Sequence, residues 1–378
     1  MDFNFSEEQK SLQQLAREIL LKEVTPERLE AIESATEWFD RPLWSTLAQA
    51  GLIGLAIPEG LGGMGYGILE ICLLLQEIGR AVAPVPALPT LVLGALPIAE
   101  FGTDEQKRAW LPSVTSGDTI LTGALLDEES SDLTTPATQA RQERNGWRLN
   151  GCKSHVPAAH LASRILVPAT TTDGAGIFLV DPQAKGVTLI RHETSTGEPL
   201  FTLNLYDVAL QAEDLLGDDS TCGGDAAAWI YDRALVALCA THVGVAQNAL
   251  EITSAYVSQR IQFGVPIGTF QAVQHRAADG YVDVEAMRWV TWRAAWKLSQ
   301  GLPATREAMV AKFWCAEGGS RIVNSAQHLH GGIGVDLDYP VHRYFLWSKA
   351  LEISLGSASP QLARLGRDMA RTGPQEFS

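Results

Sequence analysis

Residues 260–274 read Arg260-Ile261-Gln262-Phe263-Gly264-Val265-Pro266-Ile267-Gly268-Thr269-Phe270-Gln271-Ala272-Val273-Gln274. This segment joins two long stretches of helical periodicity, at 226–260 and 269–300. Its arginine is a candidate binding residue, because a guanidinium is always charged and can hold a diphosphate through two hydrogen bonds. Taken alone, Arg260 would more simply be an exposed or ion-paired arginine.

A second segment, further along the chain, is rich in glycine. It reads Gln327-His328-Leu329-His330-Gly331-Gly332-Ile333-Gly334. Three glycines in four positions cost backbone entropy, so they indicate turn-forming dihedral angles or the close approach of a ligand. A simple helix-ending turn is the alternative. His328 and His330 have no evident third ligand, so we expect no metal site here.

The periodicity of the chain changes twice. From Ser6 to about Gly117 the pattern is helical, and Ser6 is the predicted N-cap of the first helix. From about residue 119, short β-like runs separated by turn residues indicate an antiparallel barrel or sandwich. Helical periodicity returns at about Ala226. We therefore predict an α+β, mostly α fold with an N-terminal helical domain (1–118), a middle antiparallel β domain (119–225) and a C-terminal four-helix-bundle domain (226–378).

Composition excludes several classes of protein. The net charge of −15 argues against nucleic-acid binding, which requires a basic face. No apolar run approaches the ~20 residues of a membrane span, and the acidic start of the chain does not resemble a signal peptide. The 5 cysteines are scattered, without the spacing of a disulfide framework or a metal site. These features predict reduced thiols in a cytoplasmic protein that binds neither nucleic acid nor membrane.

Several short motifs occur in a fixed order along nearly the whole chain. They are Pro58-Glu59-Gly60-Leu61-Gly62-Gly63, Asn150-Gly151-Cys152-Lys153, Gly244-Val245-Ala246-Gln247 and the segment 260–274. In order and spacing they resemble the acyl-CoA dehydrogenase family. The resemblance implies a protein that binds FAD and an acyl-CoA thioester. In such enzymes a carboxylate removes the proton α to the thioester carbonyl while the β hydride passes to the flavin.

The resemblance also implies where FAD would contact this chain. In the family, the arginine that matches Arg260 reaches the pyrophosphate of a FAD held mainly by a neighbouring subunit. The residues that follow it meet the adenosine half, and the glycine-rich segment faces the same FAD. The implied cofactor-binding residues are Arg260, Phe263, Phe270, Gln271, Gln327, Gly331, Gly332 and Gly334.

The general base that the family uses is missing. Leu355 occupies the usual position of that base, and a leucine cannot accept a proton. Some family members carry the base on an earlier helix, where this chain has Ala234. Asp232 lies two residues away, about 200° around an ideal helix and therefore on the wrong face. Glu352 lies one turn before Leu355, and both acids are more simply interpreted as surface or ion-paired carboxylates.

The side of the β domain that would face the flavin ring departs from the family as well. Residues 127–132 read Asp127-Glu128-Glu129-Ser130-Ser131-Asp132, where the family has a threonine and neutral donors. Three consecutive acids there would repel an anionic or reduced flavin. His155 stands in the place of an aromatic residue and Pro157 in the place of a hydroxyl residue, and proline offers no donor.

These losses and retentions predict a non-catalytic subunit of a heteromeric acyl-CoA dehydrogenase, similar to actinobacterial enzymes that act on CoA thioesters of steroid side chains. Arg260 and the segment 327–334 would complete the FAD site of a catalytic homologue, in an assembly with two copies of each chain. The acyl-CoA substrate would bind in the partner's site. One alternative is a self-sufficient homomeric dehydrogenase with a relocated carboxylate base. Another is a structural homologue that binds no flavin.

Overall fold

The computed structural model describes residues 4–128, 135–218 and 223–373. The chain divides into two compact units, and each is described by itself. The helical unit comprises Met1–Glu30, Cys72–Ala83 and Leu235–Ser378, and the mixed unit comprises Ala31–Ile71 and Pro84–Ala234. Helices are followed by strands and then by helices again, which confirms the predicted fold class. The three-domain division at residues 118 and 225 stays a prediction.

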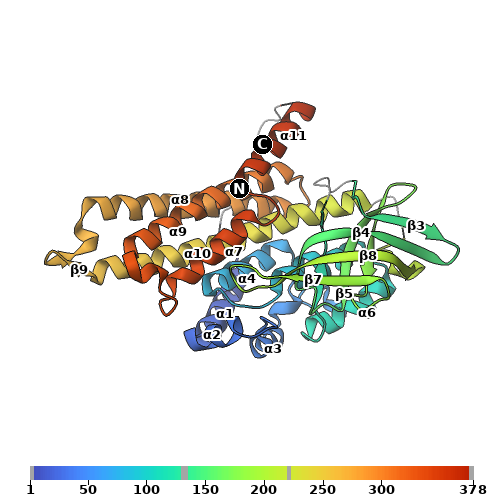
Figure 1. Ribbon diagram of the computed structural model, residues 1–378, viewed down its shortest axis with the longest axis horizontal. Helices are drawn as coiled ribbons and strands as arrows, with labels where there is room; N and C mark the ends of the chain where they lie inside the picture. The colour runs from blue at the N-terminus through green and yellow to red at the C-terminus, as the bar shows by residue number, and fades with distance from the viewer. Residues whose placement is uncertain (1–3, 129–134, 219–222, 374–378) are drawn as a thin grey trace. The chain divides into compact units, whose positions relative to one another are not determined.

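Figure 1 labels the main helices and strands in chain order. The α-helices are α1 (Glu7–Glu23), α2 (Pro26–Glu33), α3 (Arg41–Gln49), α4 (Ile68–Ala81), α5 (Leu96–Phe101), α6 (Asp104–Thr115), α7 (Gly223–Gln259), α8 (Gln271–Ser299), α9 (Thr305–His330), α10 (Val341–Ile353) and α11 (Ala358–Thr372). Shorter helical turns are η1 (Leu52–Gly54), η2 (Glu59–Leu61), the π-helix η3 (Leu88–Ala95), η4 (Ala212–Asp214), η5 (Ile267–Thr269) and η6 (Gly331–Val335). Ser6 caps α1 as predicted, since its hydroxyl accepts a hydrogen bond from the Gln9 amide at 3.2 Å.

The strands of the mixed unit form one sheet. They are β1 (Leu121–Gly123), β2 (Leu126–Asp127), β3 (Gln139–Glu143), β4 (Gly146–Pro157), β5 (Arg164–Thr170), β6 (Ala175–Val180), β7 (Val187–His192) and β8 (Leu200–Gln211). The strand order is β1-β5-β3-β4-β8-β7, with β2 paired to β4 and β6 paired to β5. Every residue of β6 is buried, as its continuous apolar sequence implies, whereas β7 alternates between half-buried and exposed residues.

The sequence analysis predicted an antiparallel sheet, but the observed sheet is mixed. β5 runs parallel to both β1 and β3, while the other pairs in this sheet are antiparallel. Parallel neighbours require a long crossover, and here the chain between β1 and β5 forms β2, β3 and β4. Local alternation of apolar residues carries no information about strand direction, so this pairing was not readable from the sequence.

A buried ion pair gives the motif Asn150-Gly151-Cys152-Lys153 a structural role. Lys153 is fully buried, and its Nζ donates a hydrogen bond to Oδ2 of Asp127 at 2.9 Å. The other carboxylate oxygen of Asp127 accepts hydrogen bonds from the amide and hydroxyl of Thr138, at 3.0 and 2.6 Å. A Cβ at Gly151 would lie 2.6 Å from the Thr138 hydroxyl oxygen, so only glycine fits beside this cluster. The motif therefore anchors β2 and β4 to the chain that leads into β3.

In the helical unit, backbone packs directly on backbone where α4 meets α7. A Cβ at Gly244 would lie 1.9 Å from the Gln76 carbonyl oxygen, and one at Gly79 would lie 2.1 Å from the Thr241 carbonyl oxygen. Real Cβ atoms do not approach that closely, so each glycine is required by the facing helix. This explains the glycine of the motif Gly244-Val245-Ala246-Gln247 physically.

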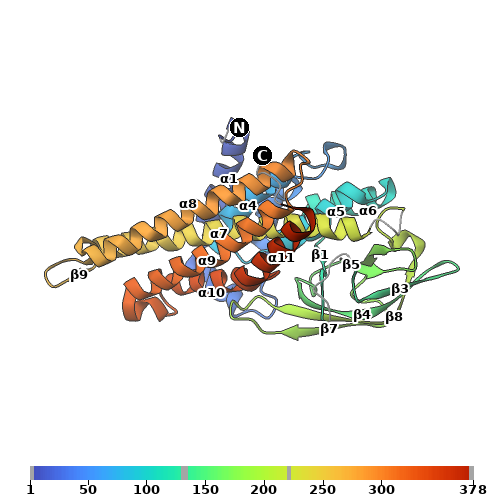
Figure 2. The same ribbon diagram turned by 90° about the horizontal axis from the view of Figure 1, so that it is seen from above.

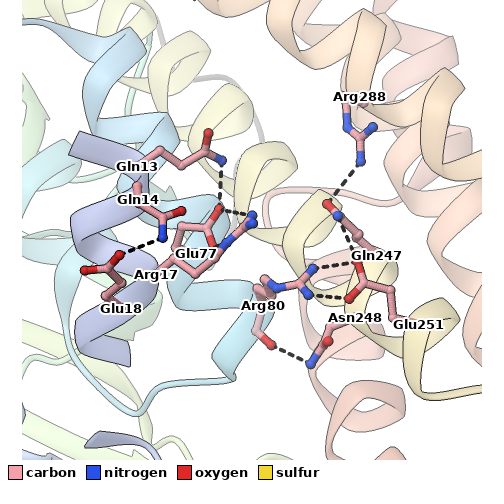
Figure 3. A network of polar contacts seen from close by, with 10 residues as sticks. All are labelled: Gln13, Gln14, Arg17, Glu18, Glu77, Arg80, Gln247, Asn248, Glu251 and Arg288. Atoms are coloured by element: carbon pink, nitrogen blue, oxygen red, sulfur yellow. Dashed lines mark hydrogen bonds and ion pairs between the residues drawn. The ribbon is translucent and has the colours of Figure 1, made fainter. Parts of the chain in front are cut away.

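Polar side chains surround this glycine contact and tie four helices together (Figure 3). Arg80 of α4 forms an ion pair with Glu251 of α7, which also accepts a hydrogen bond from Gln247 at 3.0 Å. Gln247 in turn accepts one from Arg288 of α8 at 3.0 Å. On the other side of α4, Arg17 of α1 donates two hydrogen bonds to the buried carboxylate of Glu77, at 2.9 and 3.0 Å. Figure 2 shows α7, α8 and α9 running beside one another in this unit.

Helix α7 differs from the expectation that no apolar run would approach the length of a membrane span. Within the described ranges it is the one helix long and apolar enough to cross a membrane by length and composition. However, 72% of its apolar window is buried by the rest of the protein. Burial of this kind is what the central helix of a packed bundle requires.

Substitution of Gly244 by alanine tests the glycine contact. We expect Gly244→Ala to lower the free energy of unfolding by about 1–3 kcal/mol or more, because the new methyl group meets a backbone carbonyl that cannot move alone. Gly366→Ala is the matched control: Gly366 also lies inside a helix, α11, but no atom lies within 4 Å of its Cβ position. Helix propensity alone should make that variant up to about 1 kcal/mol more stable. Equal effects in urea denaturation of the two variants would contradict the steric explanation.

Candidate cofactor-binding site

Arg260 lies directly after α7, at the start of a two-stranded hairpin. Its amide donates a hydrogen bond to the Tyr256 carbonyl at 2.8 Å, and its carbonyl accepts one from Ile267 at 2.8 Å. The backbone is therefore held from both sides, by the helix before it and by the far strand of the hairpin. The residue is exposed, and its guanidinium makes no hydrogen bond or ion pair with the described part of the chain. A fixed backbone with a free cationic group suits the binding of an anion that comes from outside this chain.

The hairpin carries the predicted aromatic residues. β9 (Ile261–Gln262) pairs with β10 (Val265–Pro266), and Phe263 and Gly264 form the turn with positive φ angles of 53° and 80°. Phe263 is 91% exposed, and its ring meets that of Phe270 edge to face at 6.2 Å. Phe270 is the N-cap of α8, and Gln271 is the exposed first residue of that helix. The structure thus brings the predicted residues from Arg260 to Gln271 together around one exposed hairpin.

The glycine-rich segment ends α9 and forms the turn η6. Gly331 has φ 64° and ψ −137°, a conformation that L-residues rarely adopt. Gly334 is buried, and a Cβ there would lie 2.8 Å from the Gln327 carbonyl oxygen. Gln327 closes the turn from its side chain, donating to the Gly334 carbonyl at 3.3 Å. The helix-ending turn itself therefore accounts for Gly331, Gly334 and Gln327, without a ligand.

Gly332 is different. Its φ is not in the left-handed region, it is exposed, and no atom lies within 4 Å of its Cβ position. Neither backbone conformation nor packing within the described residues requires a glycine here. Without a side chain, this exposed position leaves room for a group from outside the chain to approach the backbone closely.

The turn that would carry the general base keeps a defined shape without a carboxylate. Leu355 follows α10, is half-buried and has φ 53°. Its carbonyl accepts a hydrogen bond from the side chain of Gln361 at 2.8 Å. The carbonyls of Leu351 and Glu352, at the end of α10, accept hydrogen bonds from the fully buried Lys312. Burial of the Lys312 ammonium lowers its pKa.

The two alternative bases have other surroundings. Glu352 forms an ion pair with Lys349 at 2.9 Å, one turn earlier on α10. Asp232 is half-buried in the mixed unit, next to Arg233, while Ala234 is fully buried. The two acids belong to different units, and the described contacts of Glu352 are those of an ion-paired carboxylate.

The flavin-ring side of the β domain is partly described. Glu129 and the rest of 129–134 lie outside the described residues. Asp127 corrects the expectation of three repelling acids, because it is buried and paired with Lys153 and so adds no exposed negative charge. Pro157 ends β4, and its carbonyl accepts a hydrogen bond from the Thr122 hydroxyl at 2.8 Å. His155 is exposed, with φ 54°.

Glu198 is a titratable residue that the sequence motifs did not single out. Glu198 lies in the turn between β7 and β8, two residues before Leu200, which pairs with Pro157. The turn is held by a hydrogen bond from Thr194 to the Glu198 carbonyl at 2.6 Å. The surface of Glu198 is only partly buried, but desolvation raises the pKa of its carboxyl to about 7. The sequence could not predict this pKa shift, because a single glutamate in a turn forms no motif and its desolvation depends on the folded structure.

The residues present fit one half of FAD. A free guanidinium, two exposed phenylalanine rings and an open glycine turn suit a pyrophosphate and an adenosine. Pro157 has no N–H donor, and Leu355 has no basic group. FAD, if bound, would supply hydride acceptance, and Arg260, Phe263 and Phe270 would hold its nucleotide end.

Comparison with known proteins identifies the family of this chain. Three family models match successive parts of the chain: the N-terminal domain of acyl-CoA dehydrogenase at residues 6–118, the middle domain at 127–205 and the C-terminal domain at 222–370. Acyl-CoA dehydrogenase FadE27 of Mycobacterium tuberculosis is 38% identical over 98% of this chain and 100% of its own length. FadE28 of the same organism is 35% identical over 90% of this chain and 97% of its own length.

Solved structures are similar over the same extent. A chain of the ChsE4-ChsE5 complex from Mycobacterium tuberculosis is 38% identical, with a TM-score of 0.93 over 99% of this chain and 100% of that one. A chain of the Tcur3481-Tcur3483 steroid ACAD G363A variant is 47% identical, with a TM-score of 0.90 over 97% and 98% of the two chains. The chain therefore belongs to the acyl-CoA dehydrogenase family of FAD-dependent oxidoreductases.

Proposed function

We propose that this chain is a subunit of a heteromeric acyl-CoA dehydrogenase, in which it completes the FAD site of an unlike, catalytic partner and supplies no general base of its own. The observation that carries the proposal is the contrast between Gly332 and Leu355. Gly332 is an exposed glycine that the packing of the described residues does not require, and Arg260, on the hairpin after α7, is likewise exposed. Leu355 leaves a well-formed turn without the carboxylate that the reaction needs.

The proposed division of labour follows from what each group can do. Arg260 would hold the pyrophosphate, Phe263 and Phe270 would pack on the adenosine half with Gln271, and the turn Gln327–Gly334 would let the nucleotide approach closely. The partner would provide the flavin-ring contacts, the carboxylate base and the acyl-CoA site. Two similar solved structures, the ChsE4-ChsE5 complex and the Tcur3481-Tcur3483 steroid ACAD, pair unlike chains, which supports an unlike partner for this chain. An assembly with two copies of each chain, located in the cytoplasm, is part of the proposal. The steroid ACAD among these structures supports a CoA thioester of a steroid side chain as substrate.

Flavin content tests the proposal directly. Produced alone, the chain should hold little FAD, because its own ring-binding side offers no donor at Pro157. Produced together with an acyl-CoA dehydrogenase homologue from a neighbouring gene, it should give a yellow complex with about one FAD per unlike pair. Absorbance and native mass measure both quantities. A yellow homo-oligomer with one FAD per chain would overturn the proposal.

Arg260 is the residue whose loss should matter most for FAD binding. In the two-chain complex, Arg260→Ala should raise the dissociation constant of FAD by about 10–100-fold, since a charge-assisted hydrogen bond contributes about 1.5–3 kcal/mol. Arg260→Lys keeps the charge but not the paired donors, so its effect should lie between those of alanine and wild type. Arg144→Ala is the control, because Arg144 is also exposed but lies in the turn between β3 and β4. Wild-type FAD affinity in Arg260→Ala would remove Arg260 from the site.

Glu198 favours a second candidate function, a homomeric enzyme with a relocated base. A desolvated carboxyl with a pKa of about 7, close in strand register to Pro157, has the proton affinity that a general base needs. Its position on a turn held by Thr194 would keep it oriented. In that case the chain alone would turn over acyl-CoA, and Glu198→Gln would lower turnover about a hundredfold or more.

The raised pKa of Glu198 also predicts how stability depends on pH. Its folded pKa, about 7, lies above the ordinary value of 4.5, so the folded state holds the proton longer than the unfolded state. Stability should therefore fall as pH rises from 4.5 to about 7 and stay low above that. Allowing for partial exposure, Glu198→Gln should be more stable than wild type by about 1–2 kcal/mol at pH 8 and indistinguishable below pH 4.5. Urea denaturation across this range that shows parallel curves would contradict the assignment.

A further inference from the structure

His330 is the last residue of α9 and is 4% exposed. Its Nδ1 lies 2.8 Å from the Ala326 carbonyl oxygen. A carbonyl oxygen only accepts, so Nδ1 carries the proton and donates it. Nε2 then holds a lone pair that has no hydrogen-bond partner within the described ranges. Burial lowers the pKa of the ring, which keeps the histidine neutral.

Two tyrosines from separate segments pack on this ring. Tyr256 of α7 stacks on His330 with ring centres 4.3 Å apart and planes within 25°. Tyr339, between η6 and α10, meets the histidine at 5.2 Å and 52° and Tyr256 at 6.2 Å and 67°. The Tyr256 hydroxyl also donates a long hydrogen bond of 3.4 Å to the His330 carbonyl. The cluster of Tyr256, His330 and Tyr339 therefore joins the end of α7 to the end of α9.

The two stacked residues are each adjacent in the chain to a segment of the proposed FAD site: Tyr256 to Arg260, and His330 to the glycine turn. Tyr256 accepts the backbone hydrogen bond from Arg260, one helical turn later, so ring and guanidinium are carried by the same turn of chain. His330 directly precedes Gly331, whose φ of 64° starts the exposed glycine turn. A shift of the stack would change the distance between Arg260 and Gly332, although neither ring belongs to the exposed surface of that turn.

We propose that His330 and Tyr256 are positioning residues, which hold Arg260 and the glycine turn at the separation needed to bind a dinucleotide diphosphate. This inference rests on the proposed function. A diphosphate bound between two separate segments tolerates little error in their spacing, because misplacement of about 1 Å in a site costs much of its effect. Flat, neutral rings suit this purpose, since a stacked pair fixes both distance and tilt.

The experiment compares ring-removing and ring-keeping variants in the two-chain complex. His330→Ala should raise the FAD dissociation constant about tenfold or more, and His330→Phe, which keeps a ring in the stack, should stay within about threefold of wild type. Asn324→Ala is the control, because Asn324 is an exposed residue of the same helix that lies outside the segment 327–334. FAD affinity is measured by flavin fluorescence, assembly by native mass, and KM and kcat per bound FAD by dye reduction.

A positioning role requires a particular combination of results. His330→Ala should lose FAD affinity while assembly, KM and kcat per bound FAD remain those of wild type. If that variant does not assemble, Tyr256→Leu and Tyr256→Phe repeat the comparison from the other side of the stack. Wild-type FAD affinity in His330→Ala, or equal losses in the alanine and phenylalanine variants, would overturn the inference. Loss of FAD in Arg260→Ala alone would leave the proposed function standing, and no loss in either would remove both.

Discussion

The contact of backbone on backbone between α4 and α7 is the constraint on which the helical unit depends. At Gly79 and Gly244 the two helices are so close that no side chain fits between them. This contact fixes α7 along and across α4, and the Arg80–Glu251 ion pair next to it fixes its rotation (Figure 3). Helix α7 continues for about four turns beyond Gly244, and Arg260 directly follows its last residue, Gln259. The position of the exposed guanidinium is thus set by a contact that never touches it.

Buried polar groups hold helix α10 near its end. Lys312 donates to two carbonyls at the helix C-terminus, where the helix dipole is negative. His242, whose pKa desolvation lowers to about 3, is neutral and shares a hydrogen bond of 2.8 Å with Ser348. Burying such groups is costly unless each is satisfied. The hydrogen bonds of these groups satisfy this requirement and keep the shape of the turn that carries Leu355 in place of a carboxylate. A shape retained without its chemistry indicates that the turn still serves packing, since Leu355 also accepts from Gln361 at the start of α11.

The sequence predicted the helices of this protein well, because their apolar residues recur at helical spacing. The predicted helical stretches at 226–260 and 269–300 are observed as α7, Gly223–Gln259, and α8, Gln271–Ser299, and Ser6 caps α1. The β strands were harder to predict, because β3 has one buried residue and β7 has none, so neither strand shows a buried apolar face. For the site, motif spacing pointed to Arg260 and the glycine turn, but not to Glu198 or to the stack of Tyr256 on His330. Desolvation and ring stacking arise between segments far apart in the chain, and no local pattern encodes them.

The residues that distinguish this chain as a half-site are few. Consecutive acids are not among them, because Asp127 is neutralised by Lys153 inside the mixed unit. Gly331 and Gly334 are not among them either, since the turn itself requires them. What remains is narrower and stronger: a free cation at Arg260, a glycine at 332 that nothing in the described chain demands, and a leucine where a base is needed. The described residues have no use for the Arg260 cation or for a glycine at position 332, and Leu355 leaves this chain without a base. A partner that brings a flavin ring and a carboxylate, and lacks a grip on the nucleotide end, accounts for both at once.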